Sequence, residues 1–153
     1  MRPEEELRFL ILGAQREGSR QLSAALAPLG LTPAQAEVVR CVADNGPMSL
    51  RELGAMLVCE TGSPSRLVDT LVGREVVARR EDAADRRQVN LTLTAEGKRL
   101  DRAVRKIEEA LYQRIGSQLG IDGIKAGLAL LRPLVAASPS GEAIARRKAA
   151  RSG

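Results

Sequence analysis

The spacing of apolar residues changes from a helical period to a strand period within the middle of the chain, and this change restricts the fold more than any other feature. Residues 64–73 place their apolar side chains three and four positions apart, as on one face of a helix. In residues 88–93, apolar and polar side chains alternate, and residues 76–78 and a polar turn at 81–85 precede them. A short helix followed directly by a β-hairpin is therefore predicted.

Helix start and stop signals divide the preceding residues into two further short helices. Thr32 precedes Pro33, which combines an N-cap hydroxyl with a proline at a position where no N–H is needed. Asn-Gly-Pro at 45–47 ends that helix, and Ser49 caps the next one. A tight turn separates this third helix from the fourth, which begins near residues 63–64. Two short helices across a tight turn form a helix-turn-helix, and the hairpin adds a wing.

Amphipathic helices are predicted on both sides of the winged helix-turn-helix of residues 31–94. Residues 1–30 form one long helix, and residues 95–137 form two more. A single winged helix cannot cover both apolar stripes, so we expect these flanking helices to join two copies of the chain in a homodimer. The predicted fold class is mainly α with a small β-hairpin wing. The stripe residues are Leu7, Leu10, Ile11, Ala14, Leu22, Ala25 and Leu26, and then Ala103, Val104, Ile107, Ala110, Leu111 and Ile115.

The limits of the C-terminal helices follow from caps and breakers. Thr94 supplies an N-cap, and the helix that it starts should end between Gly116 and Gly120. A last helix follows and should kink or stop near Pro133. Residues 138–153 are predicted to be a disordered basic tail.

The positive charge lies mostly outside the predicted DNA-binding segment. The chain has a formal net charge of +5. Residues 32–94 hold eight Lys or Arg and nine Asp or Glu, whereas residues 95–153 hold twelve and six. If the middle segment binds DNA, it must do so through the placement of individual arginines, because its total charge is slightly negative.

The fourth helix carries the first group of candidate DNA contacts. Ser65 and Arg66 project away from the apolar face near the N-terminus of the helix, where a helix in the major groove reads base edges. Gly62 and Ser63 allow backbone N–H groups to approach a phosphate. Asp69 projects the same way but is a more natural ion-pair partner than a base reader.

The hairpin carries the second group of candidate contacts. Arg79 lies on its first strand, and Arg86 and Arg87 lie at its tip, where a guanidinium can enter the narrow minor groove. Asp85 has the wrong sign for a phosphate contact, so we interpret it as a residue that holds Arg87 in place. A loop kept soluble by charges of both signs remains the alternative.

Other classes of function find little support in the sequence. The chain contains no histidine, no glycine-rich phosphate loop and no metal-ligand spacing, so we expect no enzymatic activity, no metal and no cofactor. Cys41 and Cys59 lie far apart and are expected to be small buried hydrophobic residues. The protein is expected to be cytoplasmic, because it has neither a membrane span nor a signal sequence.

Four segments resemble the MarR family of transcriptional regulators. They are L-T-P-A-Q at 31–35, S-L-R-E-L at 49–53, S-R-L-V-D-T-L at 65–71 and D-R-R-Q-V-N-L-T-L-T-A-E-G at 85–97. The last segment, which spans the wing, is the most specific. The chain departs from the family pattern at Pro64, and at Glu75, where a glycine usually closes the recognition helix.

The resemblance implies a homodimer that binds double-stranded DNA at a pseudopalindromic operator, with Arg87 in the minor groove. It also implies a repressor released by a small-molecule effector, bound between the dimer helices and the winged domain. From the residues themselves we expect an aliphatic pocket. A winged helix that binds other proteins without specific DNA binding remains the alternative function.

Overall fold

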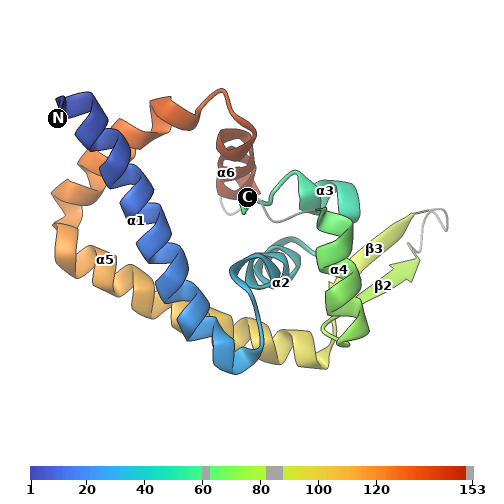
Figure 1. Ribbon diagram of the computed structural model, residues 1–153. Helices are drawn as coiled ribbons and strands as arrows, with labels where there is room; N and C mark the ends of the chain where they lie inside the picture. Colours follow the sequence, from blue (N-terminus) through green and yellow to red (C-terminus); the bar gives the residue numbers. More distant parts are fainter. Residues whose placement is uncertain (60–62, 82–87, 151–153) are drawn as a thin grey trace.

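The computed structural model describes residues 1–59, 63–81 and 88–150 (Figure 1). It confirms a mainly helical fold with a small antiparallel sheet. The helices and strands are α1 (Pro3–Leu26), the 3-10 turn η1 (Ala27–Leu29), α2 (Pro33–Asn45), β1 (Met48–Ser49), α3 (Leu50–Gly54), α4 (Pro64–Gly73), β2 (Val77–Glu81), β3 (Val89–Leu93), α5 (Ala95–Val135) and α6 (Pro139–Ala150).

The predicted helix starts of the middle segment are confirmed by their caps. The Thr32 hydroxyl accepts a hydrogen bond from the Gln35 N–H, and the Gln35 side chain accepts one from the Thr32 N–H. Ser49 and Glu52 form the same reciprocal capping box at α3. Thr94 caps α5 by accepting from the Gly97 N–H. Each cap satisfies N–H groups that would otherwise lack a partner.

The wing is a three-stranded antiparallel sheet of strand order β1-β3-β2. Strands β2 and β3 form the predicted hairpin, in which Val77 pairs with Leu93 and Arg79 with Leu91. The additional strand β1 is only two residues long and pairs Met48 with Leu91. Two residues carry no detectable strand period, so the sequence did not predict this strand.

The hydrophobic core lies in the winged domain and is almost entirely aliphatic. Helices α2 and α4 contribute residues such as Val38 and Leu71, the sheet contributes Leu91, and the first part of α5 contributes Leu100 and Val104. All five side chains are at most 1 % exposed. This core fixes α4 and the hairpin relative to each other.

Helix α5 bends where the sequence predicted an interruption. Gly120 has φ 63° and ψ 174°, a left-handed backbone geometry that glycine adopts without strain. The chain then resumes a helix that contains Pro133 and ends at Val135, close to the predicted stop. The break separates the part of α5 that packs on the core from its distal part.

The prediction of a disordered tail is wrong for residues 139–150, which form α6. Figure 1 shows α6 turned back from the end of α5 toward α2. The turn depends on Gly141, because a Cβ atom at this position would lie 2.0 Å from the Val135 carbonyl oxygen. Ala143 is buried, and α6 is tied to α2 by an ion pair between Arg147 and Glu37. These contacts are tertiary, so the local sequence did not reveal them.

Apolar side chains remain exposed along α1 and along α5 from Ile115 onward, parts of the chain that Figure 1 shows on the side away from the hairpin. The predicted stripes are therefore left partly uncovered by the single chain. The exposed residues are Leu7, Phe9, Leu10, Ile11 and Leu12 on α1, Ile115 and Leu119 just before the break in α5, and Ile121, Leu128, Leu130, Leu131 and Leu134 on distal α5. No helix among the described residues has the length and apolar character needed to cross a bilayer.

Candidate nucleic-acid interface

Helix α4 is held against the core by one face and leaves the opposite face outside. Val68 and Leu71 are fully buried, whereas Arg66 is exposed and Ser65 is half-buried. Ser63 is exposed at the N-cap, and its carbonyl oxygen accepts from the Arg66 N–H at 3.0 Å. In the described part of the chain, no carboxylate pairs with the Arg66 guanidinium. Arg66 thus has the position that a base-reading side chain needs, and Ser65 is less accessible than predicted.

An ion pair joins the recognition helix to the wing. The Arg79 guanidinium on β2 donates to the Asp69 carboxylate on α4, with a distance of 2.6 Å between Nη2 and Oδ1. This confirms Asp69 as an ion-pair partner. The Arg79 side chain is 41 % exposed and uses one of its N–H groups in this bond, so Arg79 as a DNA contact stays a prediction. The predicted contacts Asp85, Arg86 and Arg87 lie outside the described residues, as does Gly62, and remain predictions.

The turn after α4 contains Glu75 in a backbone conformation that usually requires glycine. Glu75 has φ 56°, in the left-handed region that L residues other than glycine rarely adopt. Beside it, Arg74 donates from Nη1 to the Gly30 carbonyl oxygen at 2.6 Å. The end of α4 is thereby attached to the end of η1, and through it to α1.

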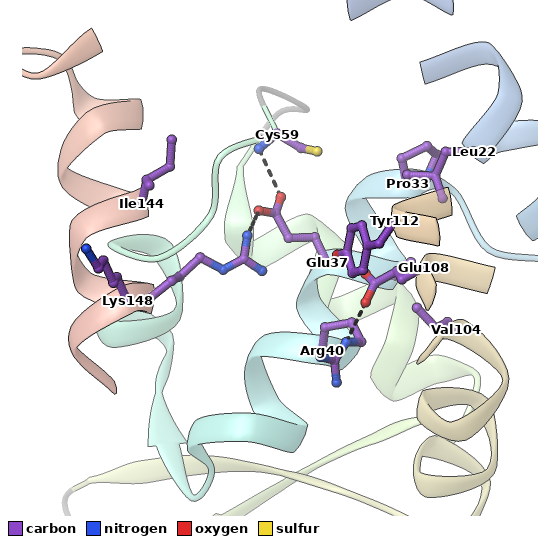
Figure 2. A pocket seen from close by; sticks show the side chains of 12 residues that line it. Leu22, Pro33, Glu37, Arg40, Cys59, Val104, Glu108, Tyr112, Ile144 and Lys148 are labelled. Atoms are coloured by element: carbon purple, nitrogen blue, oxygen red, sulfur yellow. Dashed lines mark hydrogen bonds and ion pairs between the residues drawn. The ribbon is translucent and has the colours of Figure 1, made fainter. Parts of the chain in front are cut away.

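A buried carboxylate stabilises the turn before α4. Glu37 on α2 accepts hydrogen bonds from the backbone N–H groups of Val58 and Cys59, both at 2.9 Å. The same carboxylate pairs with Arg147 at 2.8 Å (Figure 2). Glu37 has no local sequence signal, because its partners lie 21, 22 and 110 positions away along the chain.

A cluster of five charged side chains connects α2 to α5. The Arg40 side chain, 7 % exposed, contacts Asp44, Asp101 and Glu108 at 2.9 to 3.2 Å. Arg105 bonds Asp44 and Asp101 from the other side. Burial works against the charge of Arg40, but hydrogen bonds and attraction to the three carboxylates outweigh it and raise the Arg40 pKa. The cluster holds the winged domain at a fixed position on the core-facing part of α5.

A cavity of about 550 Å³ lies between α1, α2, α5 and α6 (Figure 2). Apolar side chains such as Leu22 and Ile144 share its wall with Tyr112, Arg40 and Glu108. The expectation of an aliphatic pocket is therefore only half right, because charged groups from α2, α5 and α6 also line it. Its location agrees with the predicted site between the dimer helices and the winged domain.

The two cysteines have different surroundings, contrary to the expectation that both are buried. Cys41 is buried on α2, whereas Cys59 is exposed at the turn after α3. The surrounding protein nevertheless desolvates the Cys59 thiol, and with the nearby Glu37 carboxylate this raises its pKa to about 11. Burial also raises the pKa of Cys41. Both sulfurs are thiols at neutral pH, the less reactive form.

Comparison with known proteins points to one family. The model of the MarR family matches residues 31–89. An uncharacterized HTH-type transcriptional regulator of Bacillus subtilis, YcgE, is 38 % identical over 88 residues, which are 57 % of this chain and 57 % of the relative. The match thus spans little more than half the length of that relative.

Two solved structures extend the similarity to most of the fold. A mutant MarR from E. coli in complex with operator DNA has a TM-score of 0.74 and 26 % identity, over 85 % of this chain and 94 % of that one. Bordetella bronchiseptica BpsR, whose DNA binding is regulated by 6-hydroxynicotinic acid, has a TM-score of 0.76 and 25 % identity. The match covers 90 % of this chain and 99 % of BpsR.

Proposed function

We propose that this chain is a MarR-family regulator of transcription that binds DNA and recognises a pseudopalindromic operator as a homodimer, and the match of the family model to residues 31–89 supports this. The observation that carries the proposal is the construction of α4. The core holds one face of the helix against the sheet, the Asp69–Arg79 ion pair links the helix to the wing at the surface, and Arg66 remains outside. A rigid helix with an exposed guanidinium near its start is suited to the major groove.

The homodimer is supported by the exposed apolar residues of α1 and distal α5. A surface of this kind is costly in water, and a second copy would cover it. Two copies related by a twofold axis would present two α4 helices to two half-sites of an inverted repeat.

Operator binding is tested with DNA taken from the intergenic region beside the gene. Fluorescence anisotropy at fixed salt should show much tighter binding to a duplex that carries an inverted repeat than to the same duplex with one half-site scrambled. Equal affinity for both duplexes would contradict sequence-specific binding. A folded dimer that binds neither duplex would favour the alternative, a winged helix that binds other proteins.

Arg66 is the side chain whose role this assay resolves best. We expect Arg66→Ala to cost about 1–3 kcal/mol of operator binding and to relax base preference within each half-site, because a guanidinium reads guanine through two hydrogen bonds. Arg102→Ala is the matched control, since Arg102 is exposed on α5 outside α4 and the wing. A uniform loss on all DNA sequences would make Arg66 a phosphate contact instead.

We further propose that the protein is a repressor released by a small organic anion that binds the cavity. The cavity combines an apolar wall and the Tyr112 ring with the ion pairs Arg40–Glu108 and Arg147–Glu37, and a ligand carboxylate on a small apolar body would enter by sharing the donors of these two arginines. Regulation of BpsR by 6-hydroxynicotinic acid gives a precedent in a protein of this fold. Small carboxylic acids should raise the melting temperature and release operator DNA, and Tyr112→Ala should reduce both effects.

A further inference from the structure

We propose that α6 is a positioning element of the winged domain (residues 31–94), in which Arg147 holds Glu37 and Glu37 holds the turn at Val58 and Cys59, just after α3. Arg147 is then a positioning residue for operator recognition, although it does not need to touch DNA. The inference rests on the proposed function for its effect on operator binding, but its structural part is measurable without DNA.

Glu37 is the central residue of this connection. Its carboxylate oxygens accept the N–H groups of two consecutive residues, Val58 and Cys59, at the point where the chain leaves α3 for α4. Hydrogen bonds from N–H groups to a charged acceptor are stronger than neutral ones. The side chain of one α2 residue thus binds the backbone N–H groups of two consecutive residues just after α3.

Arg147 makes it favourable to keep Glu37 charged in this position. Glu37 is only 8 % exposed, and a buried carboxylate is costly unless it is paired and hydrogen-bonded. Arg147 Nη1 lies 2.8 Å from Glu37 Oε1, and Arg147 Nη2 lies 3.3 Å from the Cys41 sulfur. Figure 2 shows the Glu37 carboxylate between Cys59 on one side and α6 on the other.

The geometry of the α5–α6 junction brings Arg147 to this place. The Ser138 hydroxyl accepts from the Gly141 N–H and donates to the Val135 carbonyl, which closes the turn between the helices. Gly141 lets the first turn of α6 pass against the Val135 backbone, and Ala143 is buried beyond it. A bulkier residue at 141 would displace α6 without removing any charge.

The neighbouring Arg146 provides the matched control. It is exposed and adjacent in sequence, so Arg146→Ala removes the same charge from the same helix without breaking the bond to Glu37. Positive charge on α6 could raise DNA affinity simply by attracting phosphates, and the two variants separate that effect from positioning.

The test measures full-length dimers of the unmodified protein, Arg147→Ala, Arg147→Lys, Arg146→Ala and Gly141→Ala. The first readout is hydrogen exchange of the Val58 and Cys59 amides without DNA. The second is affinity for the operator and for the scrambled duplex. We expect Arg147→Ala and Gly141→Ala to speed exchange at both amides and to weaken operator binding about 3- to 30-fold, the range typical of residues that couple sites. Arg147→Lys should restore part of the exchange protection and part of the operator affinity. Arg146→Ala should change affinity for the operator and for the scrambled duplex equally, and should leave hydrogen exchange unchanged.

Two results would overturn the inference. One is unchanged exchange at Val58 and Cys59 in both Arg147→Ala and Gly141→Ala. The other is an equal loss of operator affinity in Arg147→Ala and Arg146→Ala, which would reduce α6 to a source of bulk charge. If Arg147→Ala fails to fold, Gly141→Ala and Arg147→Lys still decide the matter. If the unmodified protein binds no operator, the proposed function fails, while the exchange data still show whether α6 positions the turn.

Discussion

The winged domain and the flanking helices contain the same kinds of aliphatic residues, but these residues are buried in the winged domain and exposed on the flanking helices. In the winged domain, aliphatic side chains from α2, α4, the sheet and the start of α5 are fully enclosed by the chain itself. In α1 and distal α5, leucines and isoleucines of similar number are left exposed. The winged domain gains free energy of folding from burial within the single chain. Helix α1 and distal α5 gain it only when another surface covers their apolar side chains. The single chain therefore encloses the core of its winged domain but leaves the apolar side chains of α1 and distal α5 exposed.

The comparison predicts very different costs for the same substitution in the two regions. Leu71→Ala should lower the free energy of unfolding by about 2–5 kcal/mol, because it leaves a cavity in a core position that is 0 % exposed. Leu128→Ala, at a position 45 % exposed in the single chain, should change the stability of the monomer by less than about 0.5 kcal/mol. Urea denaturation at dilutions that separate the dimer checks both values. Equal costs would mean that distal α5 is buried within its own chain.

Disrupting the proposed dimer interface should weaken operator binding without unfolding the winged domain. Leu10 is 63 % exposed on α1, and a charged side chain there would be buried unpaired in the dimer. Leu10→Glu should give a folded monomer by sedimentation and weaken operator binding on the order of 100-fold, since two linked half-site contacts become one. Val89→Glu on the wing, at a position 46 % exposed, is the control and should remain dimeric. If the unmodified protein sediments as a stable monomer at micromolar concentration, α1 and distal α5 do not form a dimer interface.

Substitutions at the wing tip test whether side-chain geometry or net charge governs operator affinity. Arg87→Ala should weaken operator binding strongly. Asp85→Ala should weaken it too, although removing a negative charge near phosphates favours binding by simple electrostatics. If Asp85 holds Arg87 in place, its loss adds the ordering cost of a flexible arginine, up to about 2 kcal/mol. Asp85→Ala binding the operator as well as the unmodified protein does would reduce Asp85 to a solubilising residue.

A smaller effect should appear at the end of the recognition helix. Glu75→Gly should stabilise the protein by about 0.5 to 1 kcal/mol, because glycine relieves the left-handed strain at the expense of a more flexible unfolded chain. Glu75→Ala keeps the strain and removes only the charge, so it should bring no such gain. Thermal melts of the two variants measure the difference. A melting temperature for Glu75→Gly no higher than that of Glu75→Ala would show that the turn is not strained.

Local signals were sufficient for the elements of the winged domain. Caps at Thr32, Ser49 and Thr94 act within three residues of their partners, so the sequence shows both members of each interaction. The hairpin period and the position of Asp69 on the outer face of α4 are equally local. The same is true of the break at Gly120, where a single residue type permits the conformation.

The contacts that join the winged domain to α5 and α6 cannot be recognised from the local sequence. Arg40 meets Asp101 and Glu108 across 61 and 68 positions, and Arg147 meets Glu37 across 110. A charged residue on a helix has the same sequence pattern whether it faces water or a distant partner. The prediction of a disordered tail failed for this reason, since residues 139–150 carry few apolar side chains larger than alanine and are held in place by contacts with α5 and α2.

The sequence by itself therefore determined the winged helix-turn-helix, its caps and hairpin, and the apolar stripes of the flanking helices, because each depends on residues a few positions apart. Only the tertiary structure decided that Arg79 is bound by Asp69, that Glu37 accepts the N–H groups of Val58 and Cys59, and that α6 docks on α2. Those interactions join residues that the folded chain alone brings within bonding distance, and the free energy that selects them comes from burial and charge pairing after the elements have packed.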